Sequence, residues 1–360
     1  FHDNDSVSFR IREVMAQHHF DENGLKEMEM YHPEGGVTAQ ASLWDYQRSA
    51  GFVLHEGIYQ GMFDLHGGYY DHPQLIQGIR PILELLDRAK DSEQTSIAQI
   101  LVVADEASCS YMGFQIDRGD SPWNSGLGTD LIQFQPGFIR SGAPFDSVLL
   151  EDLPKVSVEP YKLIMFLNTY HMDDATRDFV NTRLKKDGRS LLWIYAPGLF
   201  NGNGQSVEAM QQLLGMKITP SSDESFAPVQ FELTPEGRQW MSSQQVEPIN
   251  GPIGSELKNR KLFAVDDASA EALGKENASG SVLFARKDMG GWTSYYAAAQ
   301  VFPPEFVRAL AKASGVHIYS ESNDAVYVNK SYITVHAATD GSRTITMPGA
   351  VDVSDAFTGE

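Results

Sequence analysis

Four short, largely apolar runs constrain the fold of this chain more than any other feature of its sequence. Runs of about five residues that are rich in β-branched side chains are typical of strands buried on both faces of a parallel sheet. The runs occupy residues 100–104, 145–149, 163–167 and 191–195.

The segments between these runs alternate with them in the manner of an α/β protein. Residues 173–186 predict a helix, capped by Asp173 or Asp174 and ended by Gly188. Short apolar strands that alternate with amphipathic helices indicate a doubly wound parallel sheet. We therefore predict the α/β class, with this sheet in the middle of the chain.

The first ninety residues predict a different arrangement of strands and helices. Residues 1–8 resemble the end of a strand followed by an acidic loop, and 58–64 predict a second strand. Helices are predicted at 9–17, 38–55 and 73–89, the last interrupted or kinked at Pro81. The helix at 38–55 has an apolar stripe at helical spacing, formed by Leu43, Tyr46, Ala50, Val53 and Leu54. Strand and helix alternate as in a βα repeat, but two units leave bare edges and cannot close a barrel alone.

The remaining third of the chain predicts less regular structure. Residues 220–260 are rich in Ser, Pro, Glu and Gln and predict loops around one weak strand. Later strands are predicted at 262–265, 282–285 and 294–297, followed by a helix at 303–314. Residues 316–360 alternate apolar and polar positions, which suggests a small antiparallel β-module.

Charge and cysteine content exclude several functions. The 360 residues have a formal net charge of −20, which disfavours nucleic acid and anionic membranes as partners. No run of eighteen apolar residues predicts a membrane span. The single cysteine, Cys109, allows neither an intrachain disulfide nor a cysteine-rich zinc site. The glycine-rich stretch 200–204 lacks the lysine and spacing of a phosphate loop, and the histidines show no metal-ligand spacing. We expect no cofactor and no metal.

The chain begins at Phe1, without a methionine or a signal peptide, and its first residues resemble the interior of a fold. We therefore expect a fragment of a longer protein. Either the cytoplasm or the periplasm is compatible with one cysteine.

The loop Phe63-Asp64-Leu65-His66-Gly67-Gly68-Tyr69-Tyr70-Asp71 follows the predicted strand at 58–64. Carboxylates beside exposed aromatic rings suit a sugar, because rings stack on its apolar faces while acids bind its hydroxyls. Asp64, His66, Tyr69 and Tyr70 are therefore candidate sugar-binding residues. An ordinary polar turn is the alternative.

Three stretches of the chain together resemble one family. The first is this loop, extended through Asp71-His72-Pro73. The other two are residues 161–197 and the tail from Gly290-Gly291-Trp292 to Asn329-Lys330-Ser331-Tyr332. In order and spacing the chain resembles the carboxy-terminal half of glycoside hydrolases of the family 42 β-galactosidase type. The resemblance implies the end of a catalytic (β/α)8 barrel at 1–92, an amidotransferase-like, flavodoxin-like domain at 93–315 and a small β-domain at 316–360. It also implies a homotrimer and an upstream barrel half that completes the active site.

The same resemblance implies a retaining mechanism with its nucleophile at the end of barrel strand seven and its acid/base upstream of Phe1. Asp3 is the nucleophile candidate and Asp5 the runner-up, while His2 is expected to contact substrate. Relatives usually have glutamate at the matching position, so Asp3 is shorter by one methylene. Both acids have an alternative role as helix caps or loop hydrogen-bond acceptors. Trp44 is expected to be a core residue.

Amidotransferase chemistry requires a cysteine on a strand-to-helix elbow and a histidine that activates it. The elbow candidate, Tyr195-Ala196-Pro197-Gly198, has no nucleophile, and Cys109 follows the first strand instead. His171 is expected to be a loop or capping residue. We therefore expect a structural or oligomerising domain.

Three functional hypotheses follow. The first is an exo-acting glycosidase such as a β-galactosidase that acts on oligosaccharides, and the second is a carbohydrate-binding or assembly protein without catalysis. A stand-alone flavodoxin-like cofactor protein is the weakest, because no phosphate loop is evident. The sugar, linkage and anomer stay open.

Overall fold

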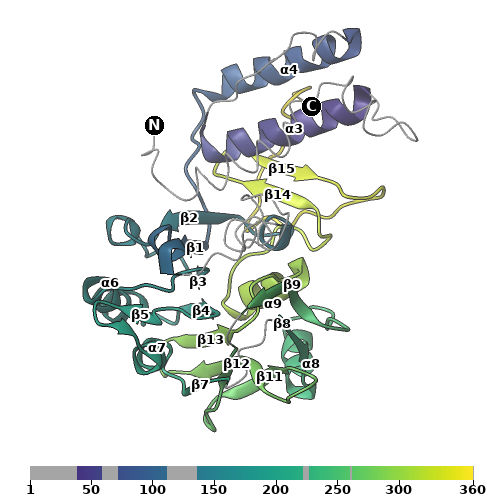
Figure 1. The fold of residues 1–360 in the computed structure, drawn as a ribbon. Helices are drawn as coiled ribbons and strands as arrows, with labels where there is room; N and C mark the ends of the chain where they lie inside the picture. Colours follow the sequence, from purple (N-terminus) through teal and green to yellow (C-terminus); the bar gives the residue numbers. More distant parts are fainter. Residues whose placement is uncertain (1–38, 59–71, 112–135, 222–226, 260–261, 360) are drawn as a thin grey trace.

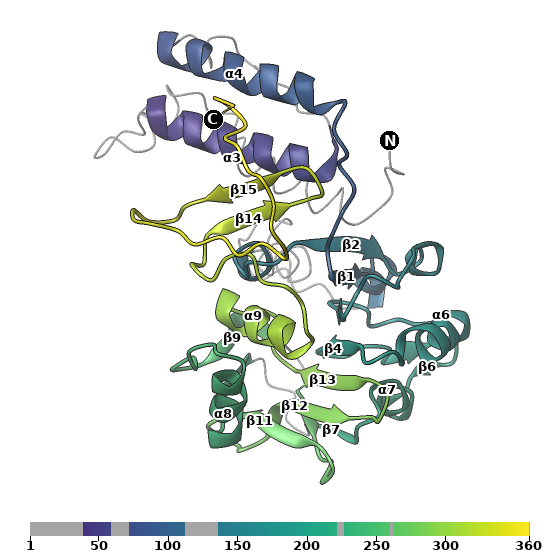
Figure 2. The same ribbon diagram turned by 180° about the vertical axis from the view of Figure 1, so that it is seen from behind.

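The structure, a computed structural model, describes residues 39–58, 72–111, 136–221, 227–259 and 262–359. Two helices lie at one end, a two-stranded hairpin lies beside them, and a large sheet with its own helices follows (Figure 1). The view from behind shows the same order (Figure 2). Within the described ranges, every helix is too short or too polar to cross a lipid bilayer.

The predicted parallel strands form one half of the large sheet. Their spatial order is β2-β1-β3-β4-β13, and each neighbouring pair is parallel. This 2-1-3-4-5 order is that of flavodoxin-like folds. The strands are β1 (Ile100–Ala104), β2 (Phe145–Leu149), β3 (Leu163–Phe166), β4 (Ser190–Ile194) and β13 (Thr293–Ala297). The predicted strands are confirmed, and the α/β class with them.

Beyond β13 the sheet continues with antiparallel strands, so the eleven-stranded sheet is mixed. The path runs β13-β12-β11-β8-β9, with β10 beside β12 and β7 beside β10. These strands are β7 (Ile218–Pro220), β8 (Ala227–Leu233), β9 (Ile253–Asn259), β10 (Phe263–Val265), β11 (Glu271–Lys275) and β12 (Val282–Asp288).

The prediction of loops around one weak strand at 220–260 was wrong. This region contains β8, helix α8 (Pro235–Ser243) and β9. The side chain of Thr234 accepts a hydrogen bond from the Gly237 amide at 3.0 Å and caps α8. Trp240 and Met241 are buried, so tertiary packing outweighs the polar composition of the segment.

The predicted helix at 173–186 is only partly α-helical. Asp173 caps helix α6 (Asp174–Phe179) by accepting from the Thr176 amide at 2.8 Å. A π-helical turn, η4 (Val180–Leu184), follows, in which the Lys185 amide donates to the Val180 carbonyl at 3.2 Å. Both ends of this turn are fully buried.

The other elements are short. Helices α7 (Val207–Leu214) and α9 (Pro304–Ala313) accompany the sheet, and α9 confirms the helix predicted at 303–314. Two 3₁₀ turns are η1 (Ala107–Tyr111) and η3 (Leu153–Lys155). The glycine-rich stretch forms a small hairpin of β5 (Phe200–Asn201) and β6 (Gly204–Gln205).

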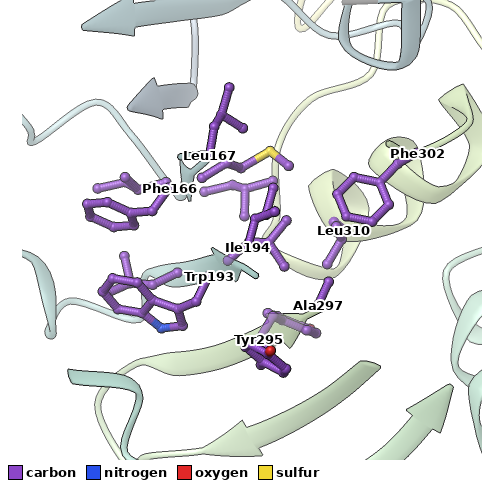
Figure 3. Packing of buried hydrophobic residues seen from close by; sticks show 14 of the residues in the cluster. Phe166, Leu167, Trp193, Ile194, Tyr295, Ala297, Phe302 and Leu310 are labelled. Carbon is purple, nitrogen blue, oxygen red and sulfur yellow. The ribbon is translucent and has the colours of Figure 1, made fainter. Parts of the chain in front are cut away.

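Aromatic and aliphatic side chains from the middle strands form the main core (Figure 3). The rings of Phe166 and Trp193 stack with centroids 4.4 Å apart. The indole nitrogen of Trp193 donates to Ser294 Oγ at 3.1 Å, and that hydroxyl donates to the Leu214 carbonyl at 2.7 Å. Each such large side chain contributes about 1.5–3 kcal/mol by leaving water.

Helices α3 (Ala39–Glu56) and α4 (Pro73–Ala89) confirm two predicted helices, and α4 continues through Pro81. The predicted stripe on α3 is buried or half-buried. Trp44 is 55% exposed, so its expected place in the core was wrong. It lies one position from Leu43 and therefore points away from the face that packs on α4. The helix predicted at 9–17 lies outside the described residues.

The predicted β-module is smaller than expected. It consists of β14 (Ala325–Val328) and β15 (Ile333–His336), which pair antiparallel. Ile345 and Met347, which alternate like strand residues, lie outside the strands, although Met347 packs against the core of this hairpin.

Candidate functional site

The residues predicted to bind or cleave a sugar lie outside the described residues. Their roles therefore stay predictions. They are His2, Asp3, Asp5, Asp64, His66, Tyr69 and Tyr70.

The two helices that flank the predicted sugar-binding loop do lie within the described residues. Leu43, near the start of α3, packs with Leu75 and Ile79, near the start of α4. At the other end, Leu54 packs with Leu85. Consecutive helices α3 and α4 are therefore parallel neighbours, as in Figure 1. A βα repeat requires this relation, because each strand returns the chain to the start of the next helix.

His72 starts the second of these helices. Its Nδ1 accepts a hydrogen bond from the Gln74 amide at 3.3 Å, and Pro73 occupies the first helical position. His72 therefore caps the start of α4. The loop therefore ends at a defined helix start.

A second candidate site lies at the carboxyl ends of the parallel strands. In a 2-1-3-4-5 sheet the topological switch point lies between β1 and β3, where ligands bind in this architecture. Asp105 follows β1, and Asn168 lies just beyond β3. The Asp105 amide donates to Asn168 Oδ1 at 2.8 Å, and Asn168 Nδ2 donates to the Asp105 carbonyl at 2.7 Å. This reciprocal pair joins the carboxyl ends of β1 and β3.

The Asp105 carboxylate is also satisfied within the chain. Its Oδ2 accepts from the Ser108 amide at 2.8 Å and from the Ser108 hydroxyl. Asp105, Ser108 and Asn168 are all buried. This cluster was not predicted from the sequence, although an Asp and an Asn that directly follow two apolar runs were the available signal. The polar groups of this cluster at the switch point are therefore bonded to one another.

The candidate elbow after β4 is a sharp turn that leads to β5. Tyr195 directly follows β4 with a φ of 62°, a left-handed conformation that is strained for a bulky residue. Its ring is buried and meets Tyr170 and Phe263 edge to face, with centroids 5.8 and 5.6 Å away. The turn therefore holds a packed aromatic ring and no cysteine nucleophile.

Cys109 and His171 do not complete a nucleophilic site. Burial, followed by the neighbouring Asp105 charge, raises the pKa of the Cys109 thiol above its ordinary value. The His171 amide donates to Ser108 Oγ at 2.8 Å, and its ring stacks on Tyr111 with centroids 4.7 Å apart. The expectation of a loop histidine is consistent with these contacts. Among the described residues, no group of three or more His, Cys, Asp or Glu could hold a metal ion.

The raised pKa of Cys109 predicts slow alkylation. Because the thiolate is the reactive species, iodoacetamide at pH 7.5 should label the folded protein at least about tenfold more slowly than the urea-unfolded protein. Mass spectrometry of the labelled protein measures both rates. Equal rates in the two states would contradict the burial of the thiol.

No protein-family model matches the sequence, and no curated protein matches it. Solved structures do match its fold. The β-galactosidase of Bacillus circulans sp. alkalophilus superposes with a TM-score of 0.61 at 16% identity, over 89% of this chain and 49% of that chain. A catalytic mutant of a GH42 β-galactosidase from G. stearothermophilus superposes with a TM-score of 0.61 at 14% identity, over 90% of this chain and 48% of that chain. The cold-adapted β-galactosidase of a Rahnella species superposes with a TM-score of 0.57 at 12% identity, over 79% of this chain and 44% of that chain.

The chain thus has the fold of part of a family 42 β-galactosidase and spans about half the length of the solved enzymes it matches. This coverage is consistent with their carboxy-terminal half, as the sequence resemblance implied. At 12–16% identity the likeness is one of fold.

Proposed function

We propose that this protein is a retaining, exo-acting β-glycosidase, such as a β-galactosidase, that acts on oligosaccharides. The observation that carries the proposal is the match to β-galactosidase folds over nine-tenths of the chain. The parallel packing of α3 and α4 supports it, because consecutive helices of a (β/α)8 barrel are arranged in this way.

In this proposal residues 1–92 are the last part of the barrel, and the active site is completed by upstream barrel residues. Asp3 is the nucleophile, with Asp5 as the second choice, and the acid/base lies in the upstream half. Retention requires these two carboxyl groups to stand about 5–5.5 Å apart. His2, Asp64, His66, Tyr69 and Tyr70 hold the sugar rather than transfer protons.

Residues 93–315 have a structural role in the proposal, as the part through which three copies assemble, and 316–360 form the small β-domain. The self-satisfied Asp105–Asn168 pair and the buried ring of Tyr195 support a non-catalytic role for the large sheet.

The test is an assay of the full-length protein against a panel of aryl β-hexosides, with the anomer of the first product followed by NMR. We expect hydrolysis of at least one β-hexoside, with the β-anomer released first. Release of the α-anomer would contradict retention. Failure to hydrolyse any of the substrates would contradict catalysis.

A second candidate is a sugar-binding or assembly protein on the same scaffold. The aspartate at position 3, where family relatives usually have glutamate, favours it, because a shift of about 1 Å can reduce a rate roughly a hundredfold. Binding of a monosaccharide to the full-length protein without turnover would support this candidate over the first.

A further inference from the structure

Tyr111, the last residue of η1, is an exposed aromatic residue whose ring is nevertheless held in place by two others. It is 43% exposed. Its ring stacks on that of His171, with centroids 4.7 Å apart and an angle of 7° between the planes. The ring of Phe200 lies 5.1 Å away, centroid to centroid. Tyr111 thus presents a fixed ring to solvent.

The backbone fixes the two rings on which Tyr111 rests. His171 and Phe200 are paired in a parallel β-bridge, and the Met172 amide donates to the Phe200 carbonyl at 3.0 Å. The His171 amide donates to Ser108 Oγ at 2.8 Å, which joins this bridge to η1. Paired positions of adjacent strands have their side chains on the same face, so the two rings form a common base for the third.

Polar groups able to bind a ligand border this stack. Asp173 is exposed, and its Oδ1 accepts from the Thr176 amide at 2.8 Å. Hydrogen bonds from Thr176, followed by the nearby His171 and Arg177, hold the pKa of Asp173 below its ordinary value. Within the described part of the chain, no hydrogen bond occupies the ring nitrogens of His171 or the hydroxyl of Tyr111. The stack therefore adjoins an ionised carboxylate and has two polar groups of its own.

The charges beside the stack favour a neutral ligand over a phosphate. Arg177 is the cation next to Asp173. Its guanidinium donates to the carbonyls of Met172, Ala209 and Gly198, so it is used within the fold. The Asp173 carboxylate would repel a phosphate. A pyranose fits instead, because its apolar face stacks on an aromatic ring while carboxylate and imidazole groups bind its hydroxyls.

We propose that Tyr111, His171 and Asp173 form a second sugar-binding site, outside the barrel, for a neutral pyranose of an oligosaccharide chain. The three residues follow β1 and β3, at the carboxyl ends of the parallel strands, where ligands bind in this architecture. The site gives the large sheet a binding role in addition to its structural one. The choice of a β-galactan among the probes rests on the proposed function, whereas the stacking geometry does not.

The test is affinity electrophoresis of the full-length protein in gels that contain β-galactan, β-glucan or β-mannan. The retardation at several polysaccharide concentrations gives a dissociation constant. Tyr111→Ala removes the exposed ring, and Tyr111→Phe keeps the ring but removes its hydroxyl. Phe357→Ala is the matched control, because it removes a ring of similar exposure, 40%, from the C-terminal tail. All four proteins have the same barrel residues, so differences among them report the second site.

With the polysaccharide that retards the wild type most, we expect Tyr111→Ala to raise the dissociation constant at least about tenfold, as for the loss of a stacked aromatic ring. Tyr111→Phe should stay within about threefold of the wild type, because the stacking surface is retained. Phe357→Ala should match the wild type.

Equal migration of the wild type and Tyr111→Ala in all three gels would overturn the site. A loss in Tyr111→Phe as large as that in Tyr111→Ala would overturn stacking as the basis of binding. Light scattering gives the mass of each assembly. A lower mass for Tyr111→Ala would make the ring a contact between copies of the chain and would likewise overturn the site.

Hydrolysis of an aryl β-galactoside by the wild type tests the proposed function separately. Retardation that depends on Tyr111 without any hydrolysis would contradict the glycosidase and support the second site. Hydrolysis without such retardation would support the glycosidase and overturn the second site.

Discussion

Replacing Asp3 with alanine in the full-length protein should lower kcat/KM for an aryl β-glycoside by roughly 10⁴-fold. A covalent nucleophile has no substitute once its carboxylate is removed, and losses of this size are typical for such residues. Steady-state kinetics with the best substrate of the aryl hexoside panel measure the effect. Added azide should restore part of the rate, because a small anion can enter the vacated space and attack the anomeric carbon.

Two companion variants make the Asp3 experiment decisive. Asp5→Ala should retain more than about a tenth of the activity if Asp5 only supports the loop, and Asp3→Glu tests the missing methylene directly. Activity that persists in Asp3→Ala but disappears in Asp5→Ala would transfer the nucleophile role to Asp5. Activity that persists in both would remove this segment from the chemistry.

Replacing Asp324 with alanine should destabilise the C-terminal hairpin by about 1–3 kcal/mol, the usual cost when donors to a buried carboxylate lose their acceptor. Asp324 is 1% exposed and forms an ion pair with Arg343. It also accepts from Ser322 Oγ at 2.6 Å and from the Ala338 amide at 2.8 Å. The carboxylate thus connects the start of β14 to the tail that follows β15.

The measurement is the free energy of local opening, from amide exchange of peptides in β14 and β15. Lys217→Ala is the control, since its ion pair with Asp266 is exposed on both sides and should contribute less than about 1 kcal/mol. Equal exchange in Asp324→Ala and the control would contradict a stabilising role for the buried pair.

Asp324 also predicts an acid sensitivity. Burial alone raises its pKa, but hydrogen bonds from Arg343 and Ser322 outweigh burial and hold the pKa below its ordinary value. Its contribution to stability is therefore fully present above the unfolded pKa of about 4 and is lost as the pH falls through the lower folded pKa. The difference in hairpin opening between wild type and Asp324→Ala should be constant from pH 5 to 8 and shrink below pH 4.

Sequence periodicity predicted the helices and strands whose own residues show the apolar pattern of a helix or of a buried strand. The buried strands at 100–104 and 163–167 are apolar throughout, and α4 has both a cap and an amphipathic stripe. Helix α8 has a cap, Thr234, but its apolar stripe is weak, because only Gly237, Trp240 and Met241 among its residues are buried. Its existence depends on contacts with distant strands, which no local pattern encodes.

Function was harder to predict for a similar reason. The elbow at Tyr195 could be located, because a small, turn-forming sequence directly follows an apolar strand. The Asp105–Asn168 pair and the hydrogen bond from Asn329 Nδ2 to the Leu54 carbonyl join residues far apart in sequence. A position directly after an apolar run was a signal for the first pair, whereas nothing in the local sequence indicates the second. For Trp44 the local pattern was misleading. A large ring within a helical pattern predicts a core residue, but the Trp44 side chain is exposed.

The position of β13 has a consequence for how the chain folds. β4 ends at Ile194 and β13 begins at Thr293, yet the two strands are paired in parallel, with Ser190 opposite Thr293. A nascent chain that has emerged only as far as β12 leaves β4 with an unpaired edge in the middle of its future sheet. Closing that long loop is entropically slow, so partly synthesised chains are exposed to aggregation until Thr293 and the residues after it have left the ribosome.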